Sequence, residues 1–125
     1  MATIEITKEN FEATINGNDI VLLDFWAAWC GPCRHFGPIF EDASEKHPNI
    51  VFGKVDTEAQ RELAAGFEIM SIPTLMAFRD NVIVFSQAGA LPGAALEELI
   101  EAVEALDMDE VHAEIAKQKA EAVVE

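Results

Sequence analysis

Residues 20–38, with the sequence IVLLDFWAAWCGPCRHFGP, constrain the fold of this chain more than any other segment. They contain both cysteines and both tryptophans of the protein. Residues 20–27 are apolar except for Asp24, which predicts a strand that is covered on both faces. Residues 34–47 have helical character. The segment therefore predicts a buried strand that leads directly into a helix.

Cys30 and Cys33 stand between that strand and that helix. Two cysteines separated by two residues can close a disulfide within one turn, and such a pair can exchange two electrons without a large rearrangement of the chain. At the start of a helix, unpaired N–H groups and the helix dipole favour an anion. We therefore expect the thiolate of Cys30 to be stabilised, and the segment predicts a redox site.

The length and the cysteine count limit which classes of protein this chain can belong to. A chain of 125 residues is expected to form one domain with an appendage at most. No run approaches the 18 or so uninterrupted apolar residues of a membrane span, and the N-terminus, MATIEITKEN, lacks a secretion signal. A cytoplasmic location is expected unless a leader has been removed. Two cysteines are too few for a disulfide framework and point to redox chemistry or a metal.

The charge is strongly acidic, with 23 Asp and Glu residues against 8 Lys and Arg residues and a formal net charge of -15. Nucleic acids and anionic membrane surfaces would be repelled, so neither is an expected partner. Acidic surface charge mainly prevents association, which is the simpler interpretation. A preference for basic partner surfaces is the alternative.

The remaining pattern predicts an alternation of strands and helices that ends in a hairpin and a helix. A mixed sheet with helices on both faces follows from this order. Proline inside a helix removes a hydrogen bond, so the helix after the cysteines is expected to be interrupted at Gly37 and Pro38. The other predicted elements are a strand at 3–6, a helix through Phe11 and Ile15 that ends at Gly17, a strand at 49–56, a short helix at 58–66, hairpin strands at 74–79 and 82–87 around a turn at Asp80 and Asn81, and a helix from Pro92 to Leu106.

Residues 107–125 are richer in charge and alanine than the rest of the chain. No glycine or proline separates them from the preceding helix, so that helix can continue. Alternatively, a new helix starts after Asp107, whose spacing to Glu110 resembles a capping box. We favour the new helix, and the expected division is a domain at 1–106 and a helical extension at 107–125.

The extension has only a thin apolar stripe, at Val111 and Ile115. It either solvates the C-terminus or docks through Val111, Ile115 and Val123 on another protein or on a second copy of this chain. A monomer with contacts of this kind is the expected state.

Five motifs stand in the order and spacing of the thioredoxin family, which this chain resembles over about residues 1–106. They are WCGPC at 29–33, DFWA at 24–27, Lys54 on the following strand, IPT at 72–74 and GA at 89–90. The resemblance implies a thioredoxin fold: a central mixed five-stranded sheet flanked by four helices, here with an extra C-terminal helical segment. It also implies a thiol–disulfide oxidoreductase that reduces protein disulfides and takes part in electron transport and cell redox homeostasis. Such a protein binds no cofactor and receives its electrons from a thioredoxin reductase.

The catalytic roles follow from the chemistry of the pair together with the resemblance. Cys30, expected at an exposed helix start, attacks a substrate disulfide, and Cys33, expected one turn deeper, resolves the mixed disulfide. The resemblance assigns Asp24 to accept the proton of Cys33, through a water, and places Lys54 nearby. Burial should raise the pKa of Asp24, and Lys54 should moderate that shift. The alternative is an ordinary buried ion pair between Asp24 and Lys54.

The resemblance also implies a shallow apolar groove for the substrate. Gly31 allows close approach of a substrate backbone, and Pro32 fits the first helical turn. Ile72 precedes a proline that is implied to be cis, and its backbone is expected to pair with an extended substrate. Met70 borders the groove where the family frequently has an arginine, which shifts partner choice. The expected groove residues are Trp29, Gly31, Pro32, Ile72, Pro73, Gly89 and Ala90.

Two other functions compete with the reductase. One is a redox-fold binding module that holds a partner through the groove and the extension. The other is a zinc protein, which the two cysteines and scattered histidines support poorly, so no metal is expected. His35 is expected to be a surface or packing residue, His47 and His112 are expected to be solvated, and Trp26 is expected in the core.

Overall fold

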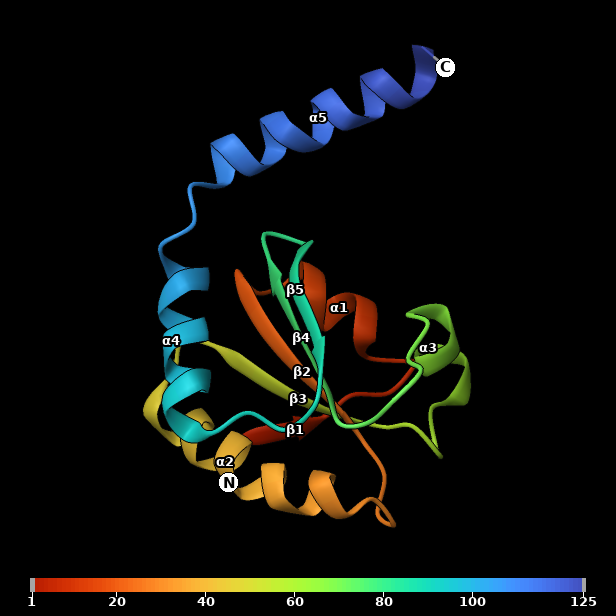
Figure 1. The fold of residues 1–125 in the computed structure, drawn as a ribbon, viewed down its shortest axis with the longest axis vertical. Coiled ribbons are helices and arrows are strands. Elements are labelled where there is room, and N and C mark those ends of the chain that lie inside the picture. Colours follow the sequence, from red (N-terminus) through yellow and green to blue (C-terminus); the bar gives the residue numbers. More distant parts are fainter. Residues whose placement is uncertain (1, 125) are drawn as a thin grey trace.

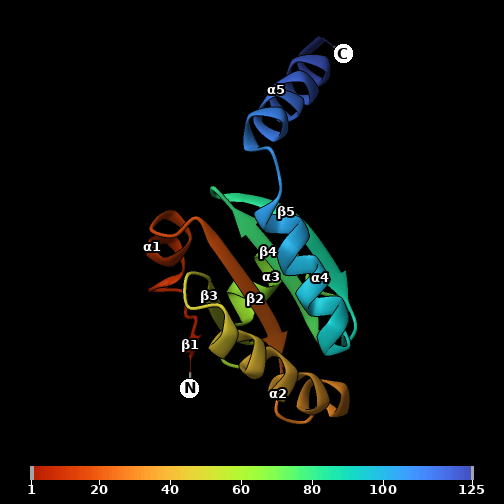
Figure 2. The ribbon, with the colours of Figure 1, turned by 90° about the vertical axis from the view of Figure 1, so that its left-hand side faces the viewer.

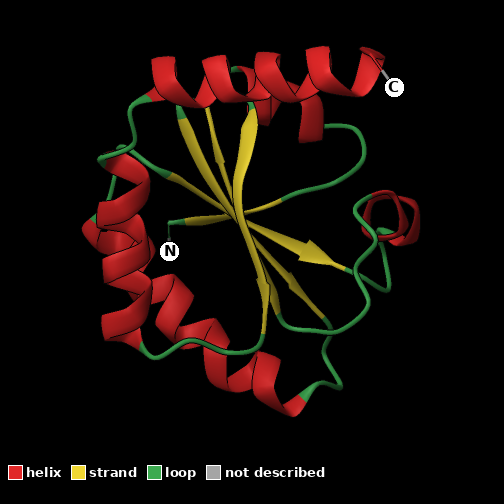
Figure 3. Cartoon of the chain, turned by 45° about the horizontal axis from the view of Figure 1, so that its top comes forward, coloured by secondary structure: helices red, strands yellow, loops and turns green. Residues whose placement is uncertain are grey.

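The structure is a computed structural model that describes residues 2–124, with side chains described for residues 2–122. Every helix and strand that the sequence predicts is present (Figure 1). Strands cross the middle of the molecule and helices surround them (Figure 3). The elements are β1 (Thr3–Glu5), α1 (Phe11–Asn16), β2 (Ile20–Trp26), α2 (Gly31–Lys46), β3 (Val51–Asp56), α3 (Arg61–Gly66), β4 (Thr74–Arg79), β5 (Val82–Ala88), α4 (Gly93–Glu104) and α5 (Met108–Val124).

Strand β2 lies at the centre of one five-stranded sheet with the order β1-β3-β2-β4-β5. It pairs in parallel with β3 and antiparallel with β4. At the two edges, β1 pairs in parallel with β3, and β5 pairs antiparallel with β4. The sheet is therefore mixed, as predicted. The central position explains why β2 is apolar on both of its faces.

Helices cover both faces of the sheet, and the side chains of β2 alternate between these faces. Leu22 belongs to a core cluster with Phe36 of α2 and Leu96 of α4. Leu23 belongs to the cluster on the opposite face, which includes residues of α1 and α3. Figure 2 shows α2 and α4 on the side that faces the viewer. Because alternate residues of a strand point to the same face, Asp24 lies on the face that α2 covers.

Gly53 allows β3 to pack closely on the face opposite α2. A Cβ atom at Gly53 would clash with Ile6 Cγ1, and it would lie 2.9 Å from Ile6 Cδ1 and 3.0 Å from Leu23 Cδ2. Ile6 is fully buried, so it has no free space to move into. Glycine at this position therefore leaves room for both side chains, beside the residue pair Asp24 and Lys54 of the β2–β3 register.

Helix α2 begins directly after Cys30, as expected for a cysteine that opens the helix, and it runs without the expected break. It starts at Gly31, so Pro32 occupies the first turn, where its missing N–H costs no hydrogen bond. Pro38 lies inside the helix rather than at an interruption. Phe36 and Phe40, on either side of Pro38, are both buried in the core, and their burial holds both halves of α2 on the sheet.

His47 is not solvated, and that prediction was wrong. The residue is half-buried at the end of α2, and its Nε2 atom lies 2.9 Å from both carboxylate oxygens of Glu97 in α4. Its ring also stacks on Phe52, with the centroids 6.4 Å apart. Packing of α4 beside α2 brings the Glu97 carboxylate to this position. His35 and His112 are exposed, as expected.

The extension starts a new helix, which confirms the favoured alternative. Helix α4 ends at Glu104 and α5 begins at Met108. The Oδ1 atom of Asp107 accepts hydrogen bonds from the backbone N–H groups of Asp109 at 3.0 Å and Glu110 at 3.3 Å. Asp107 thus satisfies donors of the first turn that have no partner within the helix.

Arg79 of β4 fastens the end of α4 to the sheet. Its Nη1 atom donates to the carbonyl oxygens of Val103, Glu104 and Leu106 at 2.7, 3.0 and 2.8 Å. Helix α5 then leads away from the sheet, and its far end lies apart from the other elements (Figure 1). The side chain of Val123, named above as a docking residue, lies outside the described side chains. Among residues 2–124, no helix is both long and apolar enough to cross a membrane.

Candidate active site

Cys30 and Cys33 form a disulfide at the N-terminus of α2, with their Cα atoms 5.2 Å apart. Cys30 is the residue that caps the helix, and its Sγ atom accepts a hydrogen bond from the backbone N–H of Cys33 at 3.2 Å. The sulfur of Cys30 therefore occupies the place where an N-terminal N–H group and the helix dipole stabilise negative charge. This is the environment that the sequence predicts for a reactive thiolate.

The two cysteines do not differ in exposure as expected. Cys30 is 4% exposed and Cys33 is 3% exposed. Cys30 is covered because the segment before β4 folds over it. Its Sγ atom lies 3.7 Å from the carbonyl oxygen of Ile72, and Ile72 packs against the buried cluster of Ala27, Cys30 and Cys33. The two cysteines differ instead in the surface pocket that each one lines.

Cys30 borders a surface groove of about 490 Å³. Trp29 is 68% exposed at its edge, and its Nε1 atom donates to Glu58 Oε1 at 2.9 Å, which fixes the indole ring. The groove contains four of the predicted groove residues. Its lining consists of Trp29, Cys30, Gly31, Pro32, Thr57, Ala64, Ile69, Met70, Ser71 and Ile72.

The other three predicted groove residues lie just outside this lining. The Ile72–Pro73 bond is cis, as the resemblance implied. The backbone N–H of Gly89 donates to the carbonyl oxygen of Pro73 at 2.8 Å, so the two segments are joined next to the groove. Gly89 has φ of 107°, a conformation that favours glycine. Ala90 is half-buried and packs against the core between the sheet, α2 and α4.

Sequence reasoning missed Thr57, Ala64, Ile69 and Ser71. Thr57 had a signal: it follows β3 directly, and the carboxyl ends of the parallel strands β2 and β3 meet at the same edge of the sheet. Its N–H and Oγ1 groups both donate to the carbonyl oxygen of Trp26, at 2.9 and 3.0 Å. Ile69 and Ser71 flank Met70, which was already placed beside the groove.

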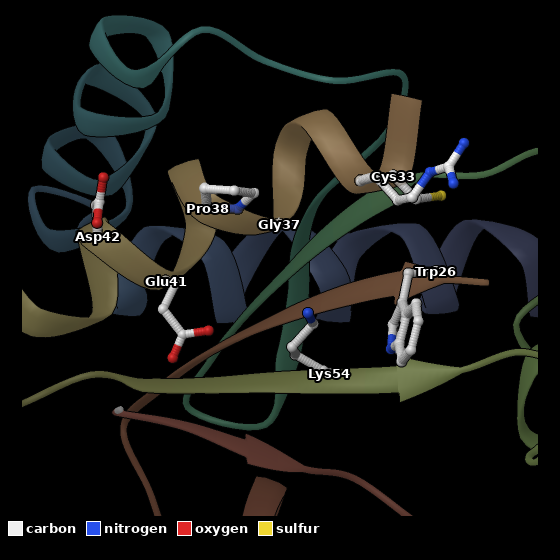
Figure 4. Close-up of a pocket in the computed structure, with 8 residues that line it drawn as sticks. Trp26, Cys33, Gly37, Pro38, Glu41, Asp42 and Lys54 are labelled. Carbon is white, nitrogen blue, oxygen red and sulfur yellow. The ribbon is translucent and has the colours of Figure 1, made fainter. Parts of the chain in front are cut away.

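Cys33 borders a different cavity, of about 470 Å³, between α2 and the sheet (Figure 4). Trp26 is half-buried on its wall rather than wholly in the core. The Lys54 side chain rises from β3 toward α2 in this cavity, and its Nζ atom lies 4.9 Å from the centroid of the Trp26 ring. The cavity lining is Trp26, Cys33, Arg34, Gly37, Pro38, Glu41, Asp42 and Lys54.

Asp24 is fully buried in β2, where the strand register places it opposite Lys54 of β3 and Leu75 of β4. Neither carboxylate oxygen has a hydrogen-bond partner among the described residues, so Asp24 and Lys54 are not joined by a hydrogen bond. Burial raises the pKa of Asp24 to about 7, and the positive charge of Lys54 opposes that rise. A carboxyl group with this pKa can take up or release a proton near neutral pH.

A metal site is not evident in the described part of the chain. Within residues 2–124, no group of three or more histidine, cysteine, aspartate or glutamate residues is arranged to hold a metal ion. The two cysteines of the chain are already joined as a disulfide. The chemistry that these residues support directly is exchange between a disulfide and a dithiol.

A mixed five-stranded sheet with a redox-capable cysteine pair at a helix N-terminus defines a thiol–disulfide oxidoreductase. The family model "Thioredoxin" matches residues 2–102. The chain is 59% identical over 121 residues to "Putative thioredoxin 2" of Streptomyces coelicolor, covering 97% of this chain and 90% of that protein. It is 37% identical over 101 residues to thioredoxin of Bacillus subtilis, covering 80% and 96%.

Solved structures agree with this comparison. A thioredoxin of Plasmodium falciparum superposes with a TM-score of 0.73 at 34% identity, covering 80% of this chain and 97% of that one. A thioredoxin variant of Halobacterium salinarum gives a TM-score of 0.77 at 30% identity, covering 84% and 92%. The chain therefore belongs to the thioredoxin family. It has the thioredoxin fold and is a thiol–disulfide oxidoreductase that reduces protein disulfides.

Proposed function

We propose that Cys30 is the attacking sulfur and Cys33 the resolving sulfur of this protein-disulfide reductase. The observation that carries the proposal is that Cys30 lines the groove that exposed Trp29 and Met70 border, whereas Cys33 lines a different pocket, together with Trp26 and Lys54. The Cys30 thiolate attacks one sulfur of a substrate disulfide and displaces the other as a thiolate. The Cys33 thiolate then attacks Cys30, releases the second substrate sulfur and closes the Cys30–Cys33 disulfide. Two electrons pass to the substrate, and two protons follow.

Asp24 is proposed to accept the proton of Cys33 during the second step. Its pKa of about 7 makes it a suitable base near neutral pH, and its oxygens have no other described partner. Water that enters the cavity beside Cys33 would carry the proton between the two groups. Lys54 lines the same cavity and keeps the pKa of Asp24 from rising further.

The groove is proposed to hold an extended segment of the substrate. The groove surface around Cys30 is apolar. It includes exposed Trp29, half-buried Ile72 and Gly31, which has no side chain and so leaves space. Pro32 completes that surface. Pro73, Gly89 and Ala90 are proposed to extend it, because the hydrogen bond between Gly89 and Pro73 holds their segments beside Ile72. Substrate specificity would then depend on the side chains next to the substrate cysteine.

The proposed partners are disulfide-containing proteins and a thioredoxin reductase that restores the dithiol. The exchange is complete within the sulfur pair, so we infer that the chain carries no bound cofactor. A reducing role suits the cytoplasm, where thiols are kept reduced, and there it would serve electron transport and redox homeostasis. The net charge of -15 disfavours nucleic acids and anionic membranes as partners.

The proposed division is a catalytic domain at 1–106 and an appended helix at 107–125, with the chain acting as a monomer. The family model ends at residue 102, and the groove lining ends at Ile72, far from α5 in the sequence. The alignment with the Streptomyces coelicolor relative covers 121 residues and so extends well into the appended segment. The segment is therefore shared with at least one relative.

Removing residues 107–125 is expected to change the rate of insulin disulfide reduction, with dithiothreitol as reductant, less than twofold. The catalytic residues and the contacts of Arg79 all remain in the shortened chain. A full-length variant with Val111→Ser and Ile115→Ser is the matched control, and circular dichroism checks that both proteins fold. A tenfold loss in both would contradict the division and favour a binding role for the extension.

A further inference from the structure

Met70 is the most exposed large apolar side chain of the described residues, at 92% exposure. It lies two residues before Ile72 and lines the groove together with Cys30 and Trp29. The other described methionines are Met76 and Met108, which are 3% and 9% exposed. One thioether is thus open to solvent next to the reacting sulfur, while the other two are covered.

We propose that Met70 is an oxidation site through which peroxides weaken the docking of protein substrates in the groove. This inference rests on the proposed role of the groove in substrate binding. In the reaction the Met70 sulfur takes one oxygen atom from the peroxide. The O–O bond breaks, an S–O bond forms, the sulfur loses two electrons, and hydrogen peroxide is reduced to water.

The disulfide state of the chain makes Met70 the sulfur that peroxide meets on this face. Oxidation of a cysteine requires the thiolate, and neither Cys30 nor Cys33 has one while they are joined. Both cysteines are also buried. The thioether of Met70 needs no deprotonation, and exposure alone governs its access to peroxide.

The sulfoxide would change what the groove can hold. Trp29, Ile69 and Ile72 give the neighbourhood of Met70 an apolar character, in which a flexible thioether adapts well to a partner. A sulfoxide places a strong hydrogen-bond acceptor there, and a substrate that covers it must remove its water without offering a partner. A protein substrate covers Met70, whereas a small disulfide that reaches only Cys30 does not.

The test begins with the full-length chain in its disulfide form, treated with hydrogen peroxide and then freed of it by catalase. Peptide mapping by mass spectrometry measures the oxidation of each methionine. Met70 should be oxidised at least about tenfold faster than Met76 and Met108, because oxidation follows exposure. After reduction by dithiothreitol, the rate with insulin should be about fivefold lower than that of untreated protein, as expected for loss of part of one apolar contact. The rate with hydroxyethyl disulfide should change less than twofold.

Two variants assign the effect. The quantity compared is the rate of insulin reduction after peroxide treatment divided by the rate before it. This ratio should stay near one in Met70→Leu, which has no thioether at position 70. In Met108→Leu it should fall as much as in the unchanged protein. Equal oxidation of the three methionines, an unchanged insulin rate after oxidation of Met70, or the same loss in Met70→Leu would each overturn the proposal. Failure of untreated protein to reduce insulin would instead contradict the proposed function itself.

Discussion

Replacing Cys33 by serine is expected to stop turnover and to leave Cys30 joined to its substrate through a stable mixed disulfide. Cys30 retains its place at the N-terminus of α2, so the first attack proceeds. Without the second sulfur, no group behind Cys30 can release the substrate. The rate of insulin reduction should fall at least about a thousandfold, as is typical when a nucleophile is removed. The adduct should be visible by mass spectrometry under non-reducing conditions.

Cys30→Ser is the matched control, because it removes the other sulfur of the same pair. It should lose turnover equally but accumulate no adduct with a substrate disulfide. The reverse result would be an adduct through Cys33 in Cys30→Ser and none in Cys33→Ser. It would show that Cys30 is not the attacking sulfur.

Replacing Asp24 by asparagine is expected to slow the release of the mixed disulfide about 100-fold near pH 7, the usual size of a general-base contribution. The asparagine side chain would keep the volume of the aspartate but could not accept the Cys33 proton. Single-turnover mixing of the reduced protein with a disulfide substrate, followed by acid quenching, measures this step separately from the first attack. Asp42→Asn is the control, because it removes an exposed carboxylate that lines the cavity beside Cys33. It should change the rate of mixed-disulfide release less than twofold.

The same variant should alter how stability depends on pH. The pKa of Asp24 is about 7 in the folded chain and 3.8 for an unperturbed carboxyl. Between these values the folded chain holds a proton that the unfolded chain has released, so stability falls as pH rises and levels off above about pH 7. The full difference is on the order of 4 kcal/mol. In Asp24→Asn this fall should disappear, which urea unfolding of the disulfide form from pH 4 to pH 8 measures.

The two measurements on Asp24→Asn separate a catalytic role from a structural one. Higher stability together with slower release supports the proton acceptor. Higher stability with an unchanged release rate would mean that the buried carboxylate only lowers stability and takes no part in the exchange.

The sequence predicted the parts of the fold that depend on local pattern. The apolar run around Asp24 predicted the central strand, because a strand covered on both faces is apolar at successive residues. Asp80 and Asn81 predicted the hairpin, and both have positive φ, 49° and 68°. The spacing of Cys30 and Cys33 predicted the disulfide that the structure contains.

Contacts between distant segments could not be predicted in this way. His47 and Glu97 are fifty residues apart, and their pairing depends on how α4 packs beside α2. The burial of Cys30 depends on Ile72, which arrives from the segment before β4. The sequence placed Asp24 in a buried strand, but it could not show that both carboxylate oxygens lack hydrogen-bond partners, because this depends on the side chains that the neighbouring elements bring near them.

The central claim is that the Cys30–Cys33 pair carries two electrons to protein disulfides as a reductant. An equilibrium titration of this pair in thiol–disulfide buffers, followed by the fluorescence of the adjacent tryptophans and paired with insulin turnover, tests it most directly. We expect a single two-electron transition close to the roughly -270 mV of thioredoxin, with turnover. A potential near the roughly -120 mV of a strong dithiol oxidant, or no turnover at all, would contradict the account.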